Sequence, residues 1–283
     1  MINIGEYNVL VAYQKIDAGM LLIATDADID SEELEKILLP NAYLPSDLSL
    51  EDPIEVFVYL DSEDRIIATN LIPKVTLGNF SYLTVKEVNS VGAFLDMGLA
   101  KDLLVPYRQQ ATEMLEGKSY LVHMYLDETT NRLIASSKIN RFLNNDNVKV
   151  MEGEEVDLIV ANQTDLGYNV IVNKTHKGLV FKSAIFRELR TGDELKGFVK
   201  TKREDNKLDI VLQQEGVSTI EPNAQIIVDF LKANAGRSDI TDKSSPELIY
   251  ETFGMSKKAF KRALGALYKK RLIKLSKEYT ELL

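Results

Sequence analysis

Residues 85–98 read Val85-Lys-Glu-Val-Asn-Ser-Val-Gly-Ala-Phe-Leu-Asp-Met-Gly98, which is two β-rich runs on either side of a turn. Further apolar runs follow at Leu103–Val105, Tyr120–Leu126 and Leu133–Ala135, separated by Gly, Asp or Asn. Short β-rich runs bounded by turn residues are typical of the strands of a small closed barrel. This part of the chain therefore predicts one five-stranded barrel.

The same pattern occurs before and after this block. Its clearest element is a polar turn, a basic residue and a β-rich run, found at residues 61–68, 127–135 and 203–210. Repetition at a fixed period is the signature of tandem domains. We predict three barrels, in residues 1–72, 73–145 and 146–216. Residues 109–115 and 183–189 are predicted to form short helices between strands three and four.

Beyond Glu221-Pro222 the apolar period changes to that of helices. Three helices are predicted, at Ala224–Ala233, Ser245–Phe253 and Ser256–Arg271. A two-stranded wing is predicted at Leu272–Leu275 and Tyr279–Leu283. This order describes a winged helix, which we place in residues 223–283 after a linker at Gln213–Pro222. The predicted fold class is mainly β, with three tandem OB-fold barrels and a small α+β domain at the C-terminus.

Composition narrows the function. The 283 residues include no cysteine and two histidines, which excludes disulfides, cysteine-ligated zinc and a thiol nucleophile and fits a reducing cytoplasm. Neither a signal peptide nor a membrane span is predicted. No phosphate-binding loop or acid–base pair stands out. We therefore predict a cytoplasmic protein that is not an enzyme, with no catalytic residue, cofactor, metal or membrane partner.

The charge is distributed unevenly along the chain. The net charge is −9, yet residues 1–72 hold 3 basic against 15 acidic residues and residues 223–283 hold 12 against 7. The first barrel is thus predicted to be acidic and to repel phosphate, whereas the last domain attracts it.

Candidate contacts to a nucleic acid lie on two barrels. Phe94 alternates with core residues and is expected to stack on a base, and Arg132 opens strand five beside it. In the third barrel Tyr168 and Phe181 are the candidate stacking residues. The basic candidates there are Lys182, Lys200, Lys202, Arg203 and Lys207. Core packing of the aromatic residues and solvation of the charges are the alternatives that the spacing leaves open.

The third predicted helix carries the strongest local signal. From Gly254 to Lys277 there are nine basic residues and no acidic one. One arc of the helix gathers Lys257, Lys258, Lys261, Arg262 and Lys269, and a separate arc, facing the core, gathers Phe260, Ala263, Leu264 and Leu267. A face of one sign favours binding to a polyanion over a merely solvated surface.

Two family resemblances rest on these residues. Gly92–Gly98 followed by Arg132–Ser136 resembles the S1-type RNA-binding barrel, although Val91 and Pro106 replace an aromatic residue and a histidine of that motif. Over nearly its whole length the chain also resembles the conserved virulence factor B family of Gram-positive bacteria. Three segments carry this second resemblance: Val56-Phe-Val-Tyr-Leu-Asp61, Gly98-Leu-Ala-Lys-Asp-Leu-Leu-Val-Pro106 and Phe253-Gly-Met-Ser-Lys-Lys-Ala-Phe-Lys-Arg-Ala-Leu-Gly-Ala-Leu-Tyr268.

The resemblance implies tandem S1-type domains, RNA binding and control of gene expression. The predicted function is therefore a non-catalytic regulator that binds single-stranded RNA through its barrels and basic winged helix. The winged helix is also compatible with binding to DNA. Two alternatives remain open. One is an interaction scaffold whose acidic first barrel docks a protein partner, and the other is an accessory factor of a ribonuclease.

Overall fold

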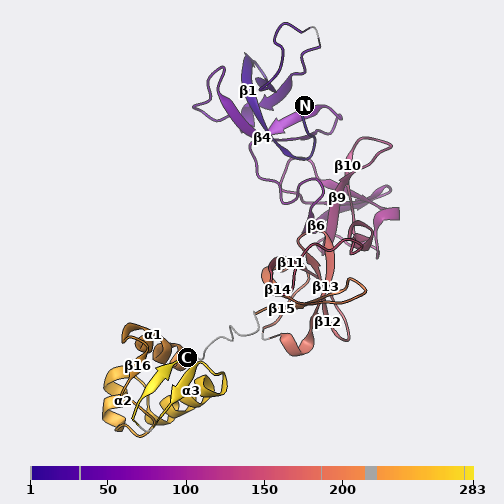
Figure 1. The fold of residues 1–283 in the computed structure, drawn as a ribbon. Coiled ribbons are helices and arrows are strands. Elements are labelled where there is room, and N and C mark those ends of the chain that lie inside the picture. The colour runs from indigo at the N-terminus through magenta and orange to yellow at the C-terminus, as the bar shows by residue number, and fades with distance from the viewer. Residues whose placement is uncertain (1, 32, 186, 214–221, 277) are drawn as a thin grey trace. The chain divides into compact units, whose positions relative to one another are not determined.

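Fifteen strands build three closed barrels of the same topology in the computed structural model, which describes residues 2–31, 33–185, 187–213, 222–276 and 278–283 (Figure 1). The first barrel contains β1 (Tyr7–Ile16), β2 (Gly19–Ala24), β3 (Ile37–Pro40), β4 (Pro53–Leu60) and β5 (Ile66–Thr69). The second contains β6 (Phe80–Asn89), β7 (Gly92–Leu95), β8 (Leu103–Pro106), β9 (Ser119–Leu126) and β10 (Leu133–Ser136). The third contains β11 (Glu155–Gln163), β12 (Gly167–Val172), β13 (His176–Phe181), β14 (Glu194–Lys202) and β15 (Leu208–Val211).

Each barrel closes in the order one-two-three-five-four, in which strands three and five are parallel and every other pair is antiparallel. Each first strand carries a bulge opposite strand two, which adds the bend that closure needs. Strand two begins at Gly19, Gly92 and Gly167, where an added Cβ would lie 1.9–2.3 Å from a carbonyl oxygen of strand three. Glycine is required there because strands two and three approach so closely.

The barrels of residues 1–212 pack on one another in sequence order, and these residues form one compact unit. Phe57 and Tyr59 of β4 are buried in the same apolar cluster as the core of the second barrel. A smaller buried cluster joins Phe80 and Leu121 of the second barrel to Ile159 and Ile171 of the third.

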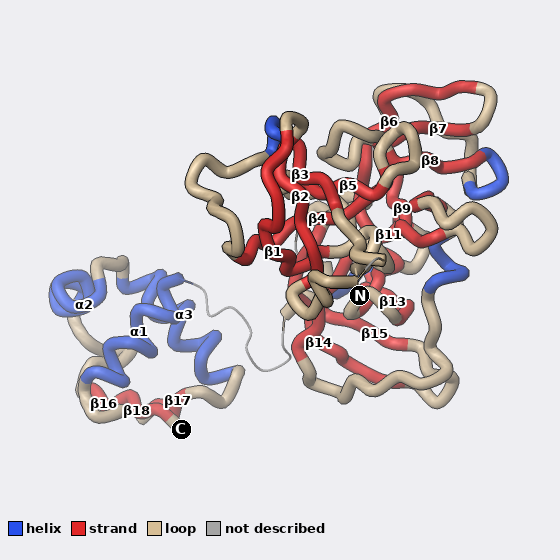
Figure 2. Tube along the Cα trace, turned by 90° about the horizontal axis from the view of Figure 1, so that it is seen from above, coloured by secondary structure: helices blue, strands red, loops and turns tan. Residues whose placement is uncertain are grey.

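The described residues from Pro222 onward in the second unit form a winged helix (Figure 2). Its elements are α1 (Pro222–Ala233), β16 (Arg237–Ser238), α2 (Pro246–Phe253), α3 (Lys257–Lys269), β17 (Ile273–Leu275) and β18 (Thr280–Leu282). Ser245 and Ser256 cap the second and third helices by accepting hydrogen bonds from Leu248 N and Ala259 N. Most of the predicted linker, Gln213–Pro222, falls on residues 214–221, which lie outside the described residues.

The predicted fold class is confirmed, and two local predictions are wrong. The wing has a third strand, β16, which is too short to leave a signal in the sequence. The helices predicted at 109–115 and 183–189 are absent from the described part of these segments, and the 3₁₀ turns η2 (Tyr107–Gln109) and η4 (Lys182–Ala184) occur instead. Similar turns, η1 (Asn41–Tyr43) and η3 (Ile139–Phe142), occur elsewhere.

Gln110 explains the absence of the first helix. Its side-chain oxygen accepts the Met114 N–H at 3.1 Å and its amide donates to Val105 O at 3.1 Å. A side chain thereby takes the bond that a helical backbone would make, and Met114 enters the barrel core. Among the helices that the structure describes, none is both long and apolar enough to span a lipid bilayer.

Candidate nucleic-acid interface

The third barrel carries a groove over the outer face of β12, β13 and β15. Val170 and Val180 point into the core, so the alternating residues Asn169 and Leu179 face outward, where they form a cross-strand pair. The groove has a volume of about 400 Å³. We call it the third-barrel groove; it is lined by Asn145, Asn169, Lys177, Gly178, Leu179, Arg203, Asp205, Lys207, Leu208 and Asp209.

Arg203 presents a fixed flat cation in this groove. Its Nε and Nη2 donate to the two carboxylate oxygens of Asp209 at 3.0 and 2.8 Å, and its guanidinium lies 5.8 Å from the ring centre of Phe181. The hydrogen bond to Asp209 raises the pKa of Arg203 above its ordinary value. A guanidinium held in plane beside an aromatic ring offers two stacking surfaces to an unpaired base.

Two lysines complete the charge of the groove. Lys207 pairs with Asp205 at 2.6 Å, and the hydrogen bond lowers the pKa of that carboxyl. Lys177 is exposed, and its ammonium has no partner among the described residues. Asn145 holds the backbone around it, because its amide donates to Lys177 O and Asn206 O, both at 2.9 Å, while its oxygen accepts the Lys177 N–H at 2.7 Å. The free cation therefore stands on a braced strand.

The other candidates of the third barrel lie around the groove and do not line it. Tyr168 is half-buried and packs against the barrel core. Lys182 is exposed at the start of η4, and Lys200 is exposed at the bulge of β14. Lys202 donates to Val148 O at 2.5 Å. Of the predicted residues, Arg203 and Lys207 line the groove, and Phe181 lies beside it, next to the Arg203 guanidinium.

The second barrel has an aromatic residue on the corresponding outer strand face, but the lysines near it are paired with carboxylates. Phe94 is half-buried, points away from the core and pairs across the strands with Leu104. Near it Lys74 contacts Asp96 at 2.5 Å, and Lys86 contacts Asp102 at 2.8 Å and Asp96 at 3.5 Å. The positive charges beside Phe94 are therefore engaged by carboxylates.

The side chain of Arg132 contacts the first barrel, although Arg132 itself lies at the start of the last strand of the second barrel. Its guanidinium is hydrogen-bonded to Asp64 in the β4–β5 turn of the first barrel. Lys101 reaches the same turn and donates to Asp61 O at 2.5 Å. Arg132 thus joins two barrels, and its guanidinium is not available as a free phosphate contact in this arrangement.

The pKa of Asp96 offers a direct test of the neutralised face. The hydrogen bond from Lys74 is the largest cause that lowers it from 3.8 to about 2, followed by the Gly98 N–H. We expect Lys74→Met to raise this pKa toward its ordinary value and Lys86→Met to raise it less, as measured by carboxyl NMR titration. Because the folded-state pKa is depressed, the ionised group stabilises the fold above pH 4, and this contribution is lost as the pH falls toward 2. Equal titration of Asp96 in the native chain and the Lys74 variant would contradict the assignment.

The first barrel lacks the features of the third-barrel groove in its described residues. Leu21 and Leu38 form its outward cross-strand pair, so no aromatic residue stands there. Arg65, in the turn that corresponds to that of Lys207, is paired with Asp61 at 2.7 Å and with Glu63 at 2.9 Å.

In the second unit the two predicted arcs of α3 are separate. Phe260, Ala263, Leu264 and Leu267 are all buried, as predicted. Lys258, Lys261, Arg262 and Lys269 are exposed and Lys257 is half-buried. Lys261 lies 3.8 Å from Asp242, and the Lys257 ammonium lies 3.5 Å from Lys243 O. An added Cβ at Gly265 would meet no atom within 4 Å, so the middle of the basic arc is open.

The groove residues Leu179 and Asn145 were not predicted from the sequence. The alternation of β13 could have placed Lys177, Leu179 and Phe181 on one face, since Val180 reads as core. Asn145 had no signal, because it belongs to the segment between two barrels and reaches the groove only in the folded chain.

Three OB-type barrels followed by a winged helix define a protein assembled from folds of nucleic-acid-binding classes. An S1 domain model matches residues 4–71 and 77–138, and a model described as the CvfB-like winged helix domain matches residues 225–282. The protein YitL of Bacillus subtilis is 30% identical over 246 residues, covering 83% of this chain and 81% of its own. The chain therefore belongs to the conserved virulence factor B family.

Proteins from three further bacteria are also similar to this chain. Conserved virulence factor B of Staphylococcus epidermidis is 27% identical and covers 81% of this chain and 82% of its own. The Staphylococcus aureus protein of the same name is also 27% identical, with 81% of each chain covered. A solved multidomain protein with nucleic acid binding domains from Streptococcus pneumoniae aligns over 99% of this chain and 98% of its own, with 25% identity and a TM-score of 0.43.

Proposed function

We propose that this chain is a cytoplasmic, non-catalytic regulator of gene expression that binds single-stranded RNA. The third-barrel groove is the observation that carries the proposal. It places a braced guanidinium, an aromatic ring and an unpaired ammonium on the outer strand face of a small barrel, among the residues that the structure describes. Aromatic stacking with nearby positive charge is the combination that single-strand binding uses. The basic arc of α3 supplies a second phosphate-binding surface.

Single strands are favoured over duplexes for a geometric reason. Stacking on Phe181 and Arg203 requires a base that is splayed out, and a duplex keeps its bases paired and stacked. Arg203 and Lys207 of the groove are also paired with carboxylates. Lys177, unpaired among the described residues, is therefore what distinguishes the groove from the Phe94 face of the second barrel, where Lys74 and Lys86 are both engaged by carboxylates.

Filter binding with a single-stranded RNA and the duplex of the same sequence tests this proposal. We expect preference for the single strand. If about four phosphates are contacted, the logarithm of the binding constant should fall with the logarithm of salt concentration at a slope of about −3. Equal affinity for both forms would reject it. Labelled RNA that is shortened in the presence of magnesium would instead favour a role with a ribonuclease.

A protein partner for the first barrel is a second proposed function, motivated by a different observation. Fifteen acidic residues against three basic ones give this barrel a strongly negative surface. Such a surface favours a basic protein over RNA. Pull-down from cells with RNase treatment separates a direct protein partner from one that is bridged by RNA.

A further inference from the structure

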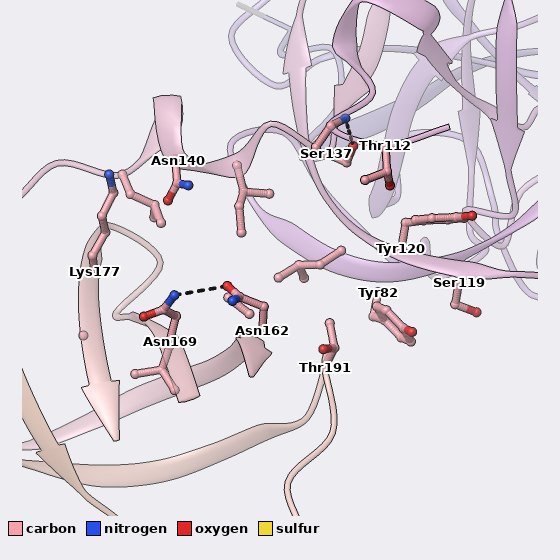
Figure 3. A pocket seen from close by; sticks show the side chains of 17 residues that line it. Tyr82, Thr112, Ser119, Tyr120, Ser137, Asn140, Asn162, Asn169, Lys177 and Thr191 are labelled. Atoms are coloured by element: carbon pink, nitrogen blue, oxygen red, sulfur yellow. Dashed lines mark hydrogen bonds between the residues drawn. The ribbon is translucent and has the colours of Figure 1, made fainter. Parts of the chain in front are cut away.

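The second and third barrels enclose a pocket between them of about 460 Å³ (Figure 3). This volume lies in the range of sites for small organic ligands or one nucleotide. Seventeen residues line it, and Lys177 is the one charged residue among these described residues. In a chain with 43 acidic residues out of 283, a lining without a carboxylate suits a ligand that carries phosphate.

Tyrosines form the second-barrel side of the pocket. Tyr82 of β6 is 45% exposed, and the backbone of Gly192 lies so close that an added Cβ would stand 2.5 Å from its ring. The neighbouring Tyr120 is fixed by its hydroxyl, which accepts the Leu115 N–H at 3.0 Å. Tyr82 therefore offers an exposed aromatic surface that is supported from the third barrel, as a stacking platform needs.

Amides form part of the opposite side. Asn169 donates through Nδ2 to Asn162 Oδ1 at 3.2 Å (Figure 3). Asn162 in turn donates to Gln163 O at 3.1 Å. The side-chain oxygen of Asn169 and the whole side-chain amide of Asn140 have no hydrogen-bond partner among the described residues. Neutral amides offer both donors and acceptors, which is how side chains recognise the edges of unpaired bases.

The pocket continues into the third-barrel groove. Asn169, Lys177 and Gly178 line both of them. One extended strand can therefore lie in the groove and place its next nucleotide in the pocket, with Lys177 at the junction to contact the phosphate between them.

We infer that the pocket between the second and third barrels is a nucleotide subsite that extends the single-strand path of the third barrel. The base stacks on Tyr82, and the amides of Asn140 and Asn169 contact its edge. This inference rests on the proposed function, because the groove supplies the neighbouring nucleotides of the same strand.

The test compares Tyr82→Ala, Tyr82→Phe and Asn140→Ala in the full chain, using single-stranded RNA oligomers of each homopolymer. We expect about a 10-fold loss of affinity for Tyr82→Ala, native affinity for Tyr82→Phe, and a changed order of preference among the homopolymers for Asn140→Ala. Tyr107→Ala is the matched control, since Tyr107 is also exposed on the second barrel, at 48%, and lies outside the pocket lining.

Crosslinking adds a readout that does not depend on folding of a variant. An RNA that contains 4-thiouridine should crosslink to pocket residues of the native chain. Native affinity in both alanine variants, with crosslinks confined to other surfaces, would overturn the subsite and leave the proposed function standing. A native chain that binds none of the oligomers would overturn both.

Discussion

Charge reversal at Lys177 and Lys207 is expected to lower affinity for single-stranded RNA by about 100-fold at low salt. Each substitution removes one attraction to phosphate and adds one repulsion, and a tenfold loss per site corresponds to about 1.4 kcal/mol. The log–log salt slope should also become shallower by about 1.4, from about 0.7 per lost phosphate contact. Both residues are exposed, so Lys177→Glu/Lys207→Glu should leave the core of Val180, Leu208 and Ile210 intact.

The matched control is the same change in net charge on the first barrel. Lys15 and Lys36 are exposed there, and Lys15→Glu/Lys36→Glu should change affinity by less than about threefold, because screening limits charges that do not touch the ligand. Titration by fluorescence anisotropy at two or more salt concentrations measures both variants, with circular dichroism to confirm the fold. Equal losses in the two variants would show that net charge, and not the third-barrel groove, governs binding.

Substitution is a better test of the first barrel than removal of residues 1–72. Charge counting alone predicts that this deletion leaves RNA affinity unchanged or raises it. The structure shows Phe57 and Tyr59 in the apolar cluster of the second barrel, and Leu77 N donates to Gly5 O at 2.8 Å. Deletion would therefore expose a buried surface of the second barrel, which the amino-acid composition of the first block does not reveal.

Local pattern predicted the elements because each barrel strand alternates around a buried row and each turn has its own polar residues. The aligned turns at 61–65, 127–132 and 203–207 illustrate this, since Asp64, Asn131 and Asn206 all take a positive φ, at 61°, 53° and 58°. The apolar arc of α3 followed from the helical period in the same way.

Contacts between barrels could not be predicted by the same means. Arg132 opens a strand in its own barrel just as Lys207 does, but a carboxylate of the preceding barrel lies against it. The pocket at Tyr82 and Asn169 likewise combines residues of two barrels, and no spacing within one repeat indicates it. Patterns within one barrel therefore predict candidate residues. They do not predict which of these residues pair with a neighbouring barrel, or where the nucleic-acid binding surface continues.

Charge reversal on α3 is expected to weaken binding to a long RNA by about tenfold or more and to a short oligomer by less than about twofold. The winged helix and the third barrel are joined by the short segment 213–222, which spans at most about 35 Å when extended. When one strand reaches two weak sites, the second binds at an effective concentration in the millimolar range. An oligomer that fills only the third-barrel groove gains nothing from this tethering, so its affinity should not depend on α3.

Lys258→Glu/Arg262→Glu tests whether the basic arc of α3 and the third-barrel groove bind one RNA together, as a composite clamp. Both residues are exposed, and the buried arc of Phe260, Leu264 and Leu267 is not altered. Lys232→Glu/Lys274→Glu is the matched control, with the same change in net charge on exposed positions of the same domain outside α3. Anisotropy titrations of the native chain and both variants with a short and a long RNA at fixed salt give the six affinities that are needed. If the α3 variant loses affinity equally for both lengths, general repulsion explains the result. If it loses none, the basic arc is a solvated surface and RNA binding resides in the barrels.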